Sequence, residues 1–529
     1  MKMTYNILIK NGTLIDGTGS PWIKNDIAII GNRIVKIGKI KVESDIVIEA
    51  DGLIISPGWI DIHVHADHTI LGNPEGLSYI HQGITTVTMG NCGLSMYPLS
   101  EEYREDLIEY LRPFTSGLLF DYDWTNLEEF NHKILGKGTS LNLVPFVGHG
   151  SIRISTMGFD DREPKSDELE TMKLYLTEAM KQGSFGMSTG LGYPPGLYTK
   201  DSELIELGKI LSEFNGVYAT HMRGEDSNLE NTIKLGLEMR VPVQVSHIGS
   251  SCGGRKNLTG RHEDTTLKNL DDARNMGLDI TADIYPYTAG SSLLSQIIPD
   301  WLHSDGVSKM IKKLEDKEIR DRVATEYNES GRDWSKVIVS YVKSSKNKDI
   351  EGMSIADIAA KRGYDVIDAV CELMIDEHGE AMNITFWGVE EDVDTLVKHP
   401  AVMPCSDGWL LAPSGPLSAG KPHPRCYGAF PRYLDQYVKQ KHILRLEEAI
   451  RRMTSLPASR LGLQDRGILK EGMKADITIF DLKEVKDLGT FQDPHQYPEG
   501  IRYVIVNGEI IIDEGKNTGK LNGEILTRS

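Results

Sequence analysis

This sequence has few cysteines and no excess of positive charge. Five cysteines, an odd number, are scattered over 529 residues, which excludes a disulfide framework and favours a reducing compartment. The 58 lysine and arginine residues are outnumbered by 77 aspartate and glutamate residues, so the formal net charge is −19. Because nucleic acid is itself a polyanion, a chain of this charge is not expected to bind it.

Long apolar runs are also missing. No uninterrupted run approaches the roughly 20 residues of a membrane-spanning helix, and the chain begins with short strand-like segments rather than a hydrophobic signal core. We therefore expect a cytoplasmic protein without membrane contact. The sequence does not indicate an oligomeric state. The chain is several times longer than the commonest domain, so we expect one large domain and one smaller domain.

Short β-branched segments separated by turn residues occur at both ends of the chain. Asn11-Gly12 and Gly31-Asn32 near the N-terminus, and Asn507-Gly508 near the C-terminus, are signals for β-hairpins. Neither end is rich enough in apolar residues to form a core alone. We therefore predict that residues 1–56 and 465–529 pair into one small, discontinuous β-sandwich domain.

Between these ends, apolar runs alternate with stretches of helical periodicity, which predicts an α/β fold of parallel βαβ units. Eight such runs fit a (β/α)8 TIM barrel over residues 57–464, a fold whose active sites lie at the carboxyl ends of the strands. A segment at about 285–386 is too long for one connection and is predicted to be an inserted, lid-like element. The eight candidate strands are residues 60–65, 85–89, 141–147, 185–188, 217–221, 243–247, 278–284 and 402–406.

The first candidate strand carries two histidines, His63 and His65. Side chains alternate between the two faces of a strand, so both imidazoles project to the same side. Two neutral imidazoles at the end of a strand suit a divalent metal ion. For this motif taken alone, two ordinary strand histidines are the alternative explanation.

Four further residues with metal-binding side chains, Cys92, His221, His247 and Asp407, fall at or just after other candidate strands. Each has an ordinary structural explanation by itself. Because a barrel brings its strand ends to a common centre, the complete set of six predicts a site for one or two zinc ions, with Cys92 able to bridge them. Asp407 is the one carboxylate in the set. It is predicted to accept a proton from an attacking water and to return it to a leaving amine.

From about Tyr5 to Ile512, the sequence resembles the N-acyl-D-amino-acid deacylases (D-aminoacylases) of the amidohydrolase superfamily. The His-x-His pair marks the superfamily, whereas the Asn-Cys-Gly, Tyr-Pro-Pro-Gly and His-Pro-Arg motifs are much narrower. The motifs that carry the resemblance are residues 57–65, 82–87, 90–93, 148–150, 188–191, 193–196, 220–223, 246–247, 283–290, 406–408 and 423–428.

The resemblance implies a zinc-dependent hydrolase whose partner is a small-molecule substrate, and which releases a D-amino acid from its N-acyl derivative. It implies one tightly bound zinc ion and a second, weaker metal position, with Cys92 in the bridging role and Asp407 as the catalytic acid/base. It also implies that Tyr193 and Arg425 hold the substrate carboxylate, the alternatives being a packed loop residue and a structural ion pair. A cyclic-amide hydrolase of the hydantoinase or dihydroorotase type, and a non-catalytic barrel scaffold, are the alternative functions. The implied ligands of the tight ion are Cys92, His221 and His247, and the weaker position lies near His63 and His65.

The sequence departs from this family at one position. Family members commonly carry a lysine two residues after the histidine of the sixth strand, whereas this chain has Gly249. Either Arg255 or Lys256 replaces that lysine, or the requirement for a substrate α-carboxylate is weakened. The start of the insertion has no basic residue, and Leu293 and Leu294 indicate an apolar pocket, so derivatives of D-methionine, D-leucine or D-phenylalanine are expected to be preferred over those of D-glutamate or D-aspartate. Packing of both leucines into the core of the insertion is the alternative.

Overall fold

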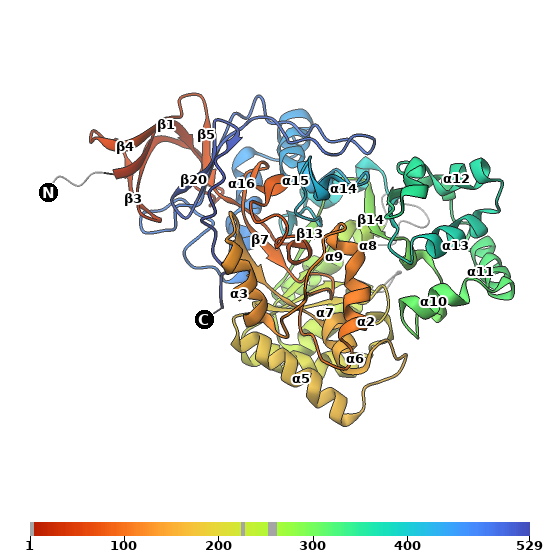
Figure 1. The fold of residues 1–529 in the computed structure, drawn as a ribbon. Coiled ribbons are helices and arrows are strands. Elements are labelled where there is room, and N and C mark those ends of the chain that lie inside the picture. The colour runs from red at the N-terminus through yellow and green to blue at the C-terminus, as the bar shows by residue number, and fades with distance from the viewer. Residues whose placement is uncertain (1–4, 224–227, 252–261, 529) are drawn as a thin grey trace.

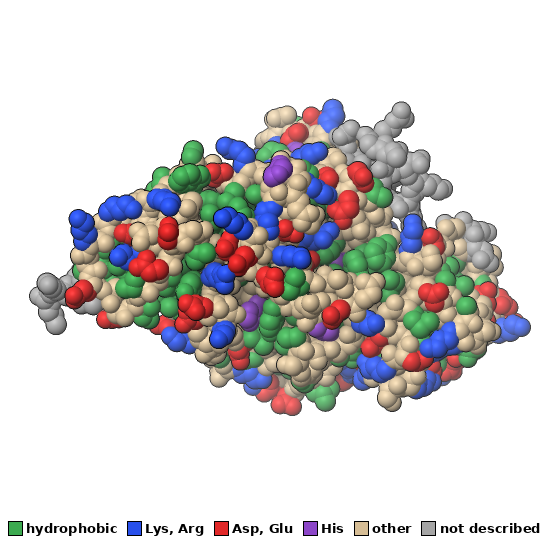
Figure 2. All heavy atoms as spheres, turned by 90° about the horizontal axis from the view of Figure 1, so that it is seen from above, with side chains coloured by type: hydrophobic (Ala, Val, Ile, Leu, Met, Phe, Trp, Pro, Cys, Tyr) green, Lys and Arg blue, Asp and Glu red, His purple; other side chains and the backbone are tan. Residues whose placement is uncertain are grey.

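The structure is a computed structural model that describes residues 5–223, 228–251 and 262–528. It has three parts (Figure 1): a sheet built from both ends of the chain, a central body of strands and helices, and a mostly helical lobe on the opposite side. Within the described residues, no helix is both long and apolar enough to cross a bilayer. On the face shown in Figure 2, acidic and basic side chains are interspersed rather than gathered by sign.

Both ends of the chain contribute to a single nine-stranded sheet. The two ends meet where β5 (Ile54–Pro57) pairs antiparallel with β18 (Ile477–Phe480). Apolar residues of both ends, such as Ile9, Ile55 and Ile505, share one hydrophobic cluster. Each end therefore depends on the other to bury its apolar face. The remaining strands are β1 (Tyr5–Leu14), β2 (Ile23–Ile30), β3 (Arg33–Gly38), β4 (Ser44–Glu49), β19 (Ile501–Val506), β20 (Glu509–Asp513) and β21 (Lys516–Asn517).

The turn predicted at Asn11-Gly12 is wrong. Strand β1 continues through these residues, and its register with β2 shifts there, so the pair forms a β-bulge. Asn11 has a φ of 62°, and its N–H donates to Asp26 Oδ1 at 3.0 Å. The same dipeptide does form the turn between β19 and β20 at Asn507-Gly508. An Asn-Gly pair supplies left-handed backbone equally well to a bulge and to a turn, so the sequence alone does not separate the two.

All eight predicted strands are present in the central body, parallel to their neighbours. They form one run of three strands and one run of six, because the third predicted strand is divided at Phe146 into β8 and β9. The two runs meet at both ends: Phe146 N–H donates to Met89 O at 2.9 Å, and Val64 forms a parallel bridge with Gly408. The strands thus surround one interior as a (β/α)8 barrel. They are β6 (Trp59–Asp61), β7 (Ile84–Met89), β8 (Asn142–Pro145), β9 (Val147–Gly148), β10 (Gly186–Gly190), β11 (Val217–His221), β12 (Val243–Val245), β13 (Ile280–Ile284) and β17 (Val402–Pro404).

The interior of the barrel is packed by apolar side chains of its strands, including Ile60, Val144 and Phe185. Leu526, from the last residues of the chain, joins the same cluster. Its N–H donates to the carbonyl oxygen of Leu143, at the amino end of β8, at 2.8 Å. The chain therefore leaves the terminal sheet after β21, and its last described residues pack against the amino ends of the barrel strands. The predicted domain boundaries stay a prediction.

Helices alternate with these strands as the periodicity predicts. In α6 (Asp201–Glu213), for example, the buried Leu204, Leu207 and Leu211 recur at three- and four-residue spacings and face the barrel core. In α3 (Leu127–Lys137), the side chain of Asn126 caps the first turn by accepting from Glu129 N at 3.0 Å. The other helices of the central body are α1 (Leu77–Ile80), α2 (Arg104–Leu111), α4 (His149–Met157), α5 (Ser166–Lys181), α7 (Asn228–Met239), α8 (Ile248–Ser251), α9 (His262–Asn275), α14 (Glu390–Lys398), α15 (Arg425–Leu434), α16 (Leu446–Met453) and α17 (Ser455–Leu461).

The long segment between β13 and α14 forms the helical lobe of Figure 1. It has its own antiparallel sheet, in the order β14-β16-β15. It also has a hydrophobic cluster of its own, separate from the barrel cores, to which Leu294, Met310 and Ile358 belong. Its role as a lid stays a prediction. Its elements are β14 (Ala289–Leu293), α10 (Val307–Lys313), α11 (Lys317–Ser330), β15 (Val337–Tyr341), α12 (Ile355–Arg362), α13 (Val366–Asp376) and β16 (Met382–Phe386).

Candidate metal centre and active site

The six side chains proposed as metal ligands come together at the carboxyl ends of the barrel strands. They form two groups that share one thiol, and the candidate ligand atoms within each group lie within 4.8 Å of one another. Such an arrangement can hold two metal ions with a common bridging ligand. The first group is His63, His65, Cys92 and Asp407, and the second is Cys92, His221 and His247.

Cys92 lies at the centre of this arrangement. Its Sγ is 3.1 Å from His63 Nε2 and 3.5 Å from His247 Nε2. Burial raises the pKa of the Cys92 thiol, but the neighbouring His63 and His247 more than offset burial and bring that pKa well below its usual range. The residue is held at a φ of 55°, and the next residue, Gly93, has no room for a side chain, because its Cβ would lie 2.7 Å from Gly190 N. The loop thus fixes a thiolate in place, and a thiolate is a strong ligand for zinc.

Asp407 follows β17 and is the carboxylate of the first group. Its Oδ1 is 3.2 Å from His65 Nε2, and its Oδ2 is 2.8 Å from Arg425 Nη1. Burial raises the pKa of the Asp407 carboxyl, but the nearby charges of Arg425 and His63 lower it by more. The net result is a pKa well below the usual range. This carboxylate is therefore ionised and able to bind a metal ion or accept a proton. The φ of 51° at Asp407 is a strained conformation of a kind common at functional sites.

A model of the Amidohydrolase family matches residues 46–512. The chain belongs to the amidohydrolase family. A D-aminoacylase of Alcaligenes xylosoxydans xylosoxydans is 32% identical over 530 residues, covering 99% of this chain and 98% of that protein. The crystal structure of an N-acyl-D-glutamate deacylase from Bordetella bronchiseptica, complexed with zinc and a phosphonate that mimics the tetrahedral intermediate, covers 100% of both chains with 28% identity and a TM-score of 0.83. A solved D-aminoacylase with a binuclear metal center covers 99% of this chain and 100% of that chain, with 30% identity and a TM-score of 0.82.

The donor set of this amidohydrolase fits zinc. Cys92, His221 and His247 supply one sulfur and two imidazole nitrogens, which is a ligand combination that zinc accepts in a tetrahedral site. The pKa of His221 is lowered, mainly by burial and by His247. It is therefore neutral, as a metal ligand must be. The assignment of individual ligands stays a prediction that metal analysis of variants can test.

Asp283 is a further part of the site, and the sequence alone predicted no role for it. Its Oδ1 is 3.2 Å from His63 Nδ1 and also accepts the N–H of His247 at 2.7 Å. Gln244 Nε2 donates to its other oxygen at 2.6 Å. A carboxylate on Nδ1 leaves the Nε2 of His63 directed at the metal position, a common arrangement behind metal-binding histidines. The signal that could have found it is a carboxylate near the carboxyl end of the seventh strand, inside a family motif.

Asp61 supports the site through hydrogen bonds to the backbone beside two of its residues. It lies two residues before His63 and is fully buried, and burial raises the pKa of its carboxyl to about 7. Its oxygens accept the N–H of His63 at 3.2 Å and the N–H of Ser406 at 3.1 Å. These bonds tie the end of β6 to the segment that carries Asp407. This role has no local signal in the sequence, because it depends on residues 345 positions apart.

The two residues expected to hold the substrate carboxylate both lie beside the metal centre. The guanidinium of Arg425 is buried, with its Cζ 4.6 Å from the ring centroid of Tyr285. Its Nε has no hydrogen-bond partner among the described residues. The hydroxyl of Tyr193 donates to the carbonyl oxygen of Cys92 at 2.6 Å, and its ring centroid is 5.0 Å from that of His221. Their role in substrate binding stays a prediction.

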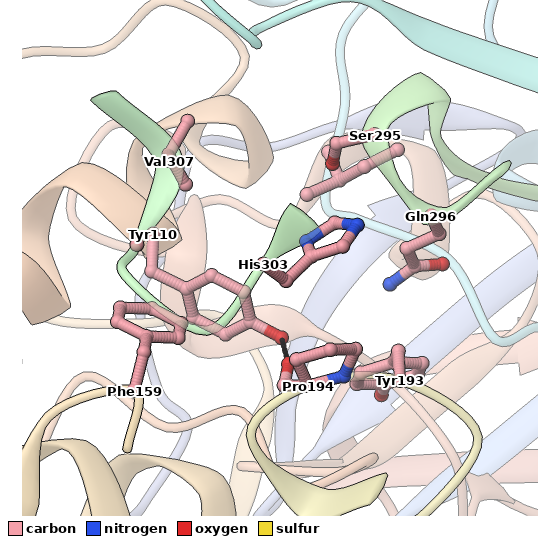
Figure 3. Close-up of a pocket in the computed structure, with 10 residues that line it drawn as sticks. Tyr110, Phe159, Tyr193, Pro194, Ser295, Gln296, His303 and Val307 are labelled. Atoms are coloured by element: carbon pink, nitrogen blue, oxygen red, sulfur yellow. Dashed lines mark hydrogen bonds between the residues drawn. The ribbon is translucent and has the colours of Figure 1, made fainter. Parts of the chain in front are cut away.

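Tyr193 also lines a pocket formed between the barrel and the inserted lobe, shown in Figure 3. Leu293, expected there from the sequence, is one of its lining residues. Leu294 packs instead into the core of the lobe, so the expectation that both leucines line a pocket is wrong for Leu294. Burial lowers the pKa of His303 to about 4, so this lining residue is neutral at physiological pH. The described lining residues are Tyr110, Phe159, Tyr193, Pro194, Leu293, Ser295, Gln296, His303, Gly306 and Val307, none of them a lysine or arginine.

The structure also shows the surroundings of position 249, where family members commonly carry a lysine. Gly249 lies in α8, two residues after His247, and is buried. A Cβ added there would lie 2.8 Å from Cη2 of Trp387. Arg255 and Lys256, the residues expected to compensate for the lysine, lie outside the described residues.

Proposed function

We propose that this chain is a zinc-dependent hydrolase of the amide bond of N-acyl-D-amino acids, releasing a carboxylate and a D-amino acid. The observation that carries the proposal is the thiolate of Cys92 shared between two groups of imidazoles, beside the ion pair of Asp407 and Arg425. A scaffold has no need of a buried carboxylate placed at a metal position. The deacylases that resemble this chain over their full length support the same reaction.

Different residues of the chain are proposed to carry out the separate steps of amide hydrolysis. Zinc held by Cys92, His221 and His247 would lower the pKa of a water molecule and polarise the amide carbonyl. Asp407, ionised beside Arg425, is placed to take a proton from the attacking water and to deliver it to the nitrogen of the leaving amine. Without that proton the amine is a poor leaving group, so the same carboxylate serves in both steps.

The substrate carboxylate is proposed to bind at Arg425. A guanidinium offers a planar set of donors that matches a carboxylate, and the Nε of Arg425 has a donor to spare. The Tyr193 hydroxyl lies beside the centre, where it can donate to the same group or to the acyl oxygen after leaving the Cys92 carbonyl. A hydantoin has no free carboxylate, so this arrangement favours N-acyl amino acids over hydantoins.

An uncharged, mainly apolar substrate side chain is proposed to occupy the pocket at Leu293 and Phe159. A second carboxylate placed there would lose its hydration without meeting a cation among the described lining residues, which costs several kcal/mol. Derivatives of D-leucine, D-methionine and D-phenylalanine are therefore the expected substrates, and those of D-glutamate the poor ones.

The experiment is a substrate panel with the purified, zinc-loaded protein. We expect hydrolysis of N-acetyl-D-leucine with a kcat/KM well above that for N-acetyl-L-leucine, N-acetyl-D-glutamate and 5-isobutylhydantoin. Faster turnover of the hydantoin would favour the cyclic-amide hydrolase, and no turnover of any substrate with zinc bound would favour a scaffold. Preference for the glutamate derivative would leave the reaction intact and overturn the neutral side-chain pocket.

A further inference from the structure

The sheet of the inserted lobe places one tryptophan against α8, the helix that follows the candidate ligand His247. Trp387 directly follows β16. Its backbone N–H donates to the carbonyl oxygen of Thr288 at 3.0 Å, which fixes the chain at this point. Its ring lies where a side chain at position 249 would be, because a Cβ on Gly249 would be 2.8 Å from Trp387 Cη2. Gly249 is two residues from the candidate ligand His247. The ring of Trp387 therefore occupies the space beside that ligand.

A second set of contacts joins Trp387 to Arg425. The ring centroids of Trp387 and Tyr285 are 6.4 Å apart in an edge-on arrangement, and Arg425 Cζ lies 4.6 Å from the centroid of the same Tyr285 ring. Gly290 allows this approach, because its Cβ would lie 3.8 Å from Trp387 Nε1 and 2.9 Å from the Tyr285 hydroxyl. The tryptophan and the arginine are thus neighbours of one aromatic ring.

The indole Nε1 of Trp387 is buried and, among the described residues, has no acceptor. A buried donor without an acceptor is costly, so such a group is normally satisfied by a ligand or by water. An indole N–H can donate a hydrogen bond to a carboxylate, but it brings no positive charge.

We propose that Trp387 is a specificity-determining residue that contacts the amino-acid end of the substrate and donates its indole N–H to the substrate carboxylate beside Arg425. This inference rests on the proposed function. Because the donor is neutral, one negative charge on the substrate meets one fixed cation and one neutral donor. The preference for a carboxylate over a carboxamide is then weaker than in a site with a second cation in the same place.

The inference is tested by substitutions at Trp387, Trp301 and Gly249. For each variant, kcat, KM and zinc content are measured on N-acetyl-D-leucine and its neutral analogue N-acetyl-D-leucinamide. Trp387→Phe keeps an aromatic ring and removes the indole N–H. We expect full zinc content and a kcat within about twofold of the wild-type value. The KM for N-acetyl-D-leucine should rise about tenfold, as for loss of one hydrogen bond to a charged group. Trp301→Phe is the matched control, since its indole donates to Glu326 within the inserted lobe at 2.9 Å. Its KM should equal that of the wild type.

The third variant adds a cation where the ring now lies. Gly249→Lys alone should lower kcat/KM for both substrates, because the new side chain collides with Trp387. Combined with Trp387→Ala it should recover turnover of N-acetyl-D-leucine, with a carboxylate-over-carboxamide preference about tenfold above that of the wild type.

An unchanged KM in Trp387→Phe, or wild-type kinetics in Gly249→Lys with Trp387 present, would overturn the inference while the wild-type activity stands. A carboxylate preference lost in Lys256→Ala, with no change in Trp387→Phe, would assign the role to that lysine instead. A zinc-loaded wild type that hydrolyses neither substrate would overturn the proposed function and this inference with it.

Discussion

At the scale of single residues, the centre depends most on Cys92, because its sulfur belongs to both groups of candidate ligands. A thiolate there is predicted to bind zinc directly and to compensate the charge of two ions when both positions are filled. Asp407 differs in kind. It is paired with Arg425 and belongs to the first group only, and its ionised carboxylate is suited to proton transfer.

Two substitutions should separate these roles. Cys92→Ala is expected to lose most bound zinc and most activity, because no other sulfur joins either group of candidate ligands. Asp407→Asn is expected to keep the fold and at least one metal ion while turnover falls about 10²–10⁴-fold, the usual contribution of general acid–base catalysis. Elemental analysis and kcat for N-acetyl-D-leucine measure both. Unchanged zinc in Cys92→Ala would remove the thiol from the ligand set, and wild-type turnover in Asp407→Asn would remove it from the mechanism.

At the scale of secondary-structure elements, the end of β14 separates two neighbouring leucines. Leu293 closes the strand and lines the pocket beside Tyr193, whereas Leu294 begins a short 3-10 helix and packs into the core of the lobe. Neighbouring residues at the end of this strand thus contribute to different parts of the protein, one to the pocket and the other to the core of the insertion.

Alanine at each position should therefore have a different effect. Leu294→Ala is expected to lower the free energy of unfolding by about 2–5 kcal/mol, as for other buried leucines, and to leave the KM for N-acetyl-D-leucine unchanged. Leu293→Ala is expected to lower kcat/KM for N-acetyl-D-leucine about tenfold or more and that for N-acetyl-D-alanine much less, since the pocket loses contacts with the larger side chain. Denaturant unfolding and steady-state kinetics on both variants decide the assignment. Equal kinetic effects of the two would show that Leu293 does not face the substrate.

At the scale of the whole molecule, the last residues connect the terminal sheet back to the barrel. Leu526 packs with Ile60 and Val144 of the barrel interior, and Leu143 N–H donates to Glu524 O at 2.8 Å. The chain end thus covers the amino ends of the strands, on the side of the barrel away from the candidate metal centre.

Leu526→Ala should lower the free energy of unfolding by about 2 kcal/mol or more without changing the kcat of the folded enzyme, because it opens a cavity far from the site. Leu521→Ala, at a more exposed leucine of the same segment, is the matched control and should cost much less. Thermal or denaturant unfolding gives the comparison. Equal stability of the two variants would mean that the chain end contributes no packing to the barrel.

The sequence by itself determined the kind of elements and the chemistry of the centre. Periodicity predicted all eight barrel strands, because a buried parallel strand must be a short apolar run whatever surrounds it. The residue types of the site followed from their places at strand ends, since a barrel has only one centre on which those ends converge. Those signals are local, so they can be read before the chain is folded.

Only the tertiary structure decided which residues support the site and which face the substrate. The bonds of Asp283 to His63 and of Asp61 to Ser406 join residues 220 and 345 positions apart. The contrast between Leu293 and Leu294, and the ring of Trp387 beside Gly249, depend on how the inserted sheet packs against the barrel. Such contacts are fixed by the burial of surfaces that are distant in the chain, and no local pattern of residues specifies them.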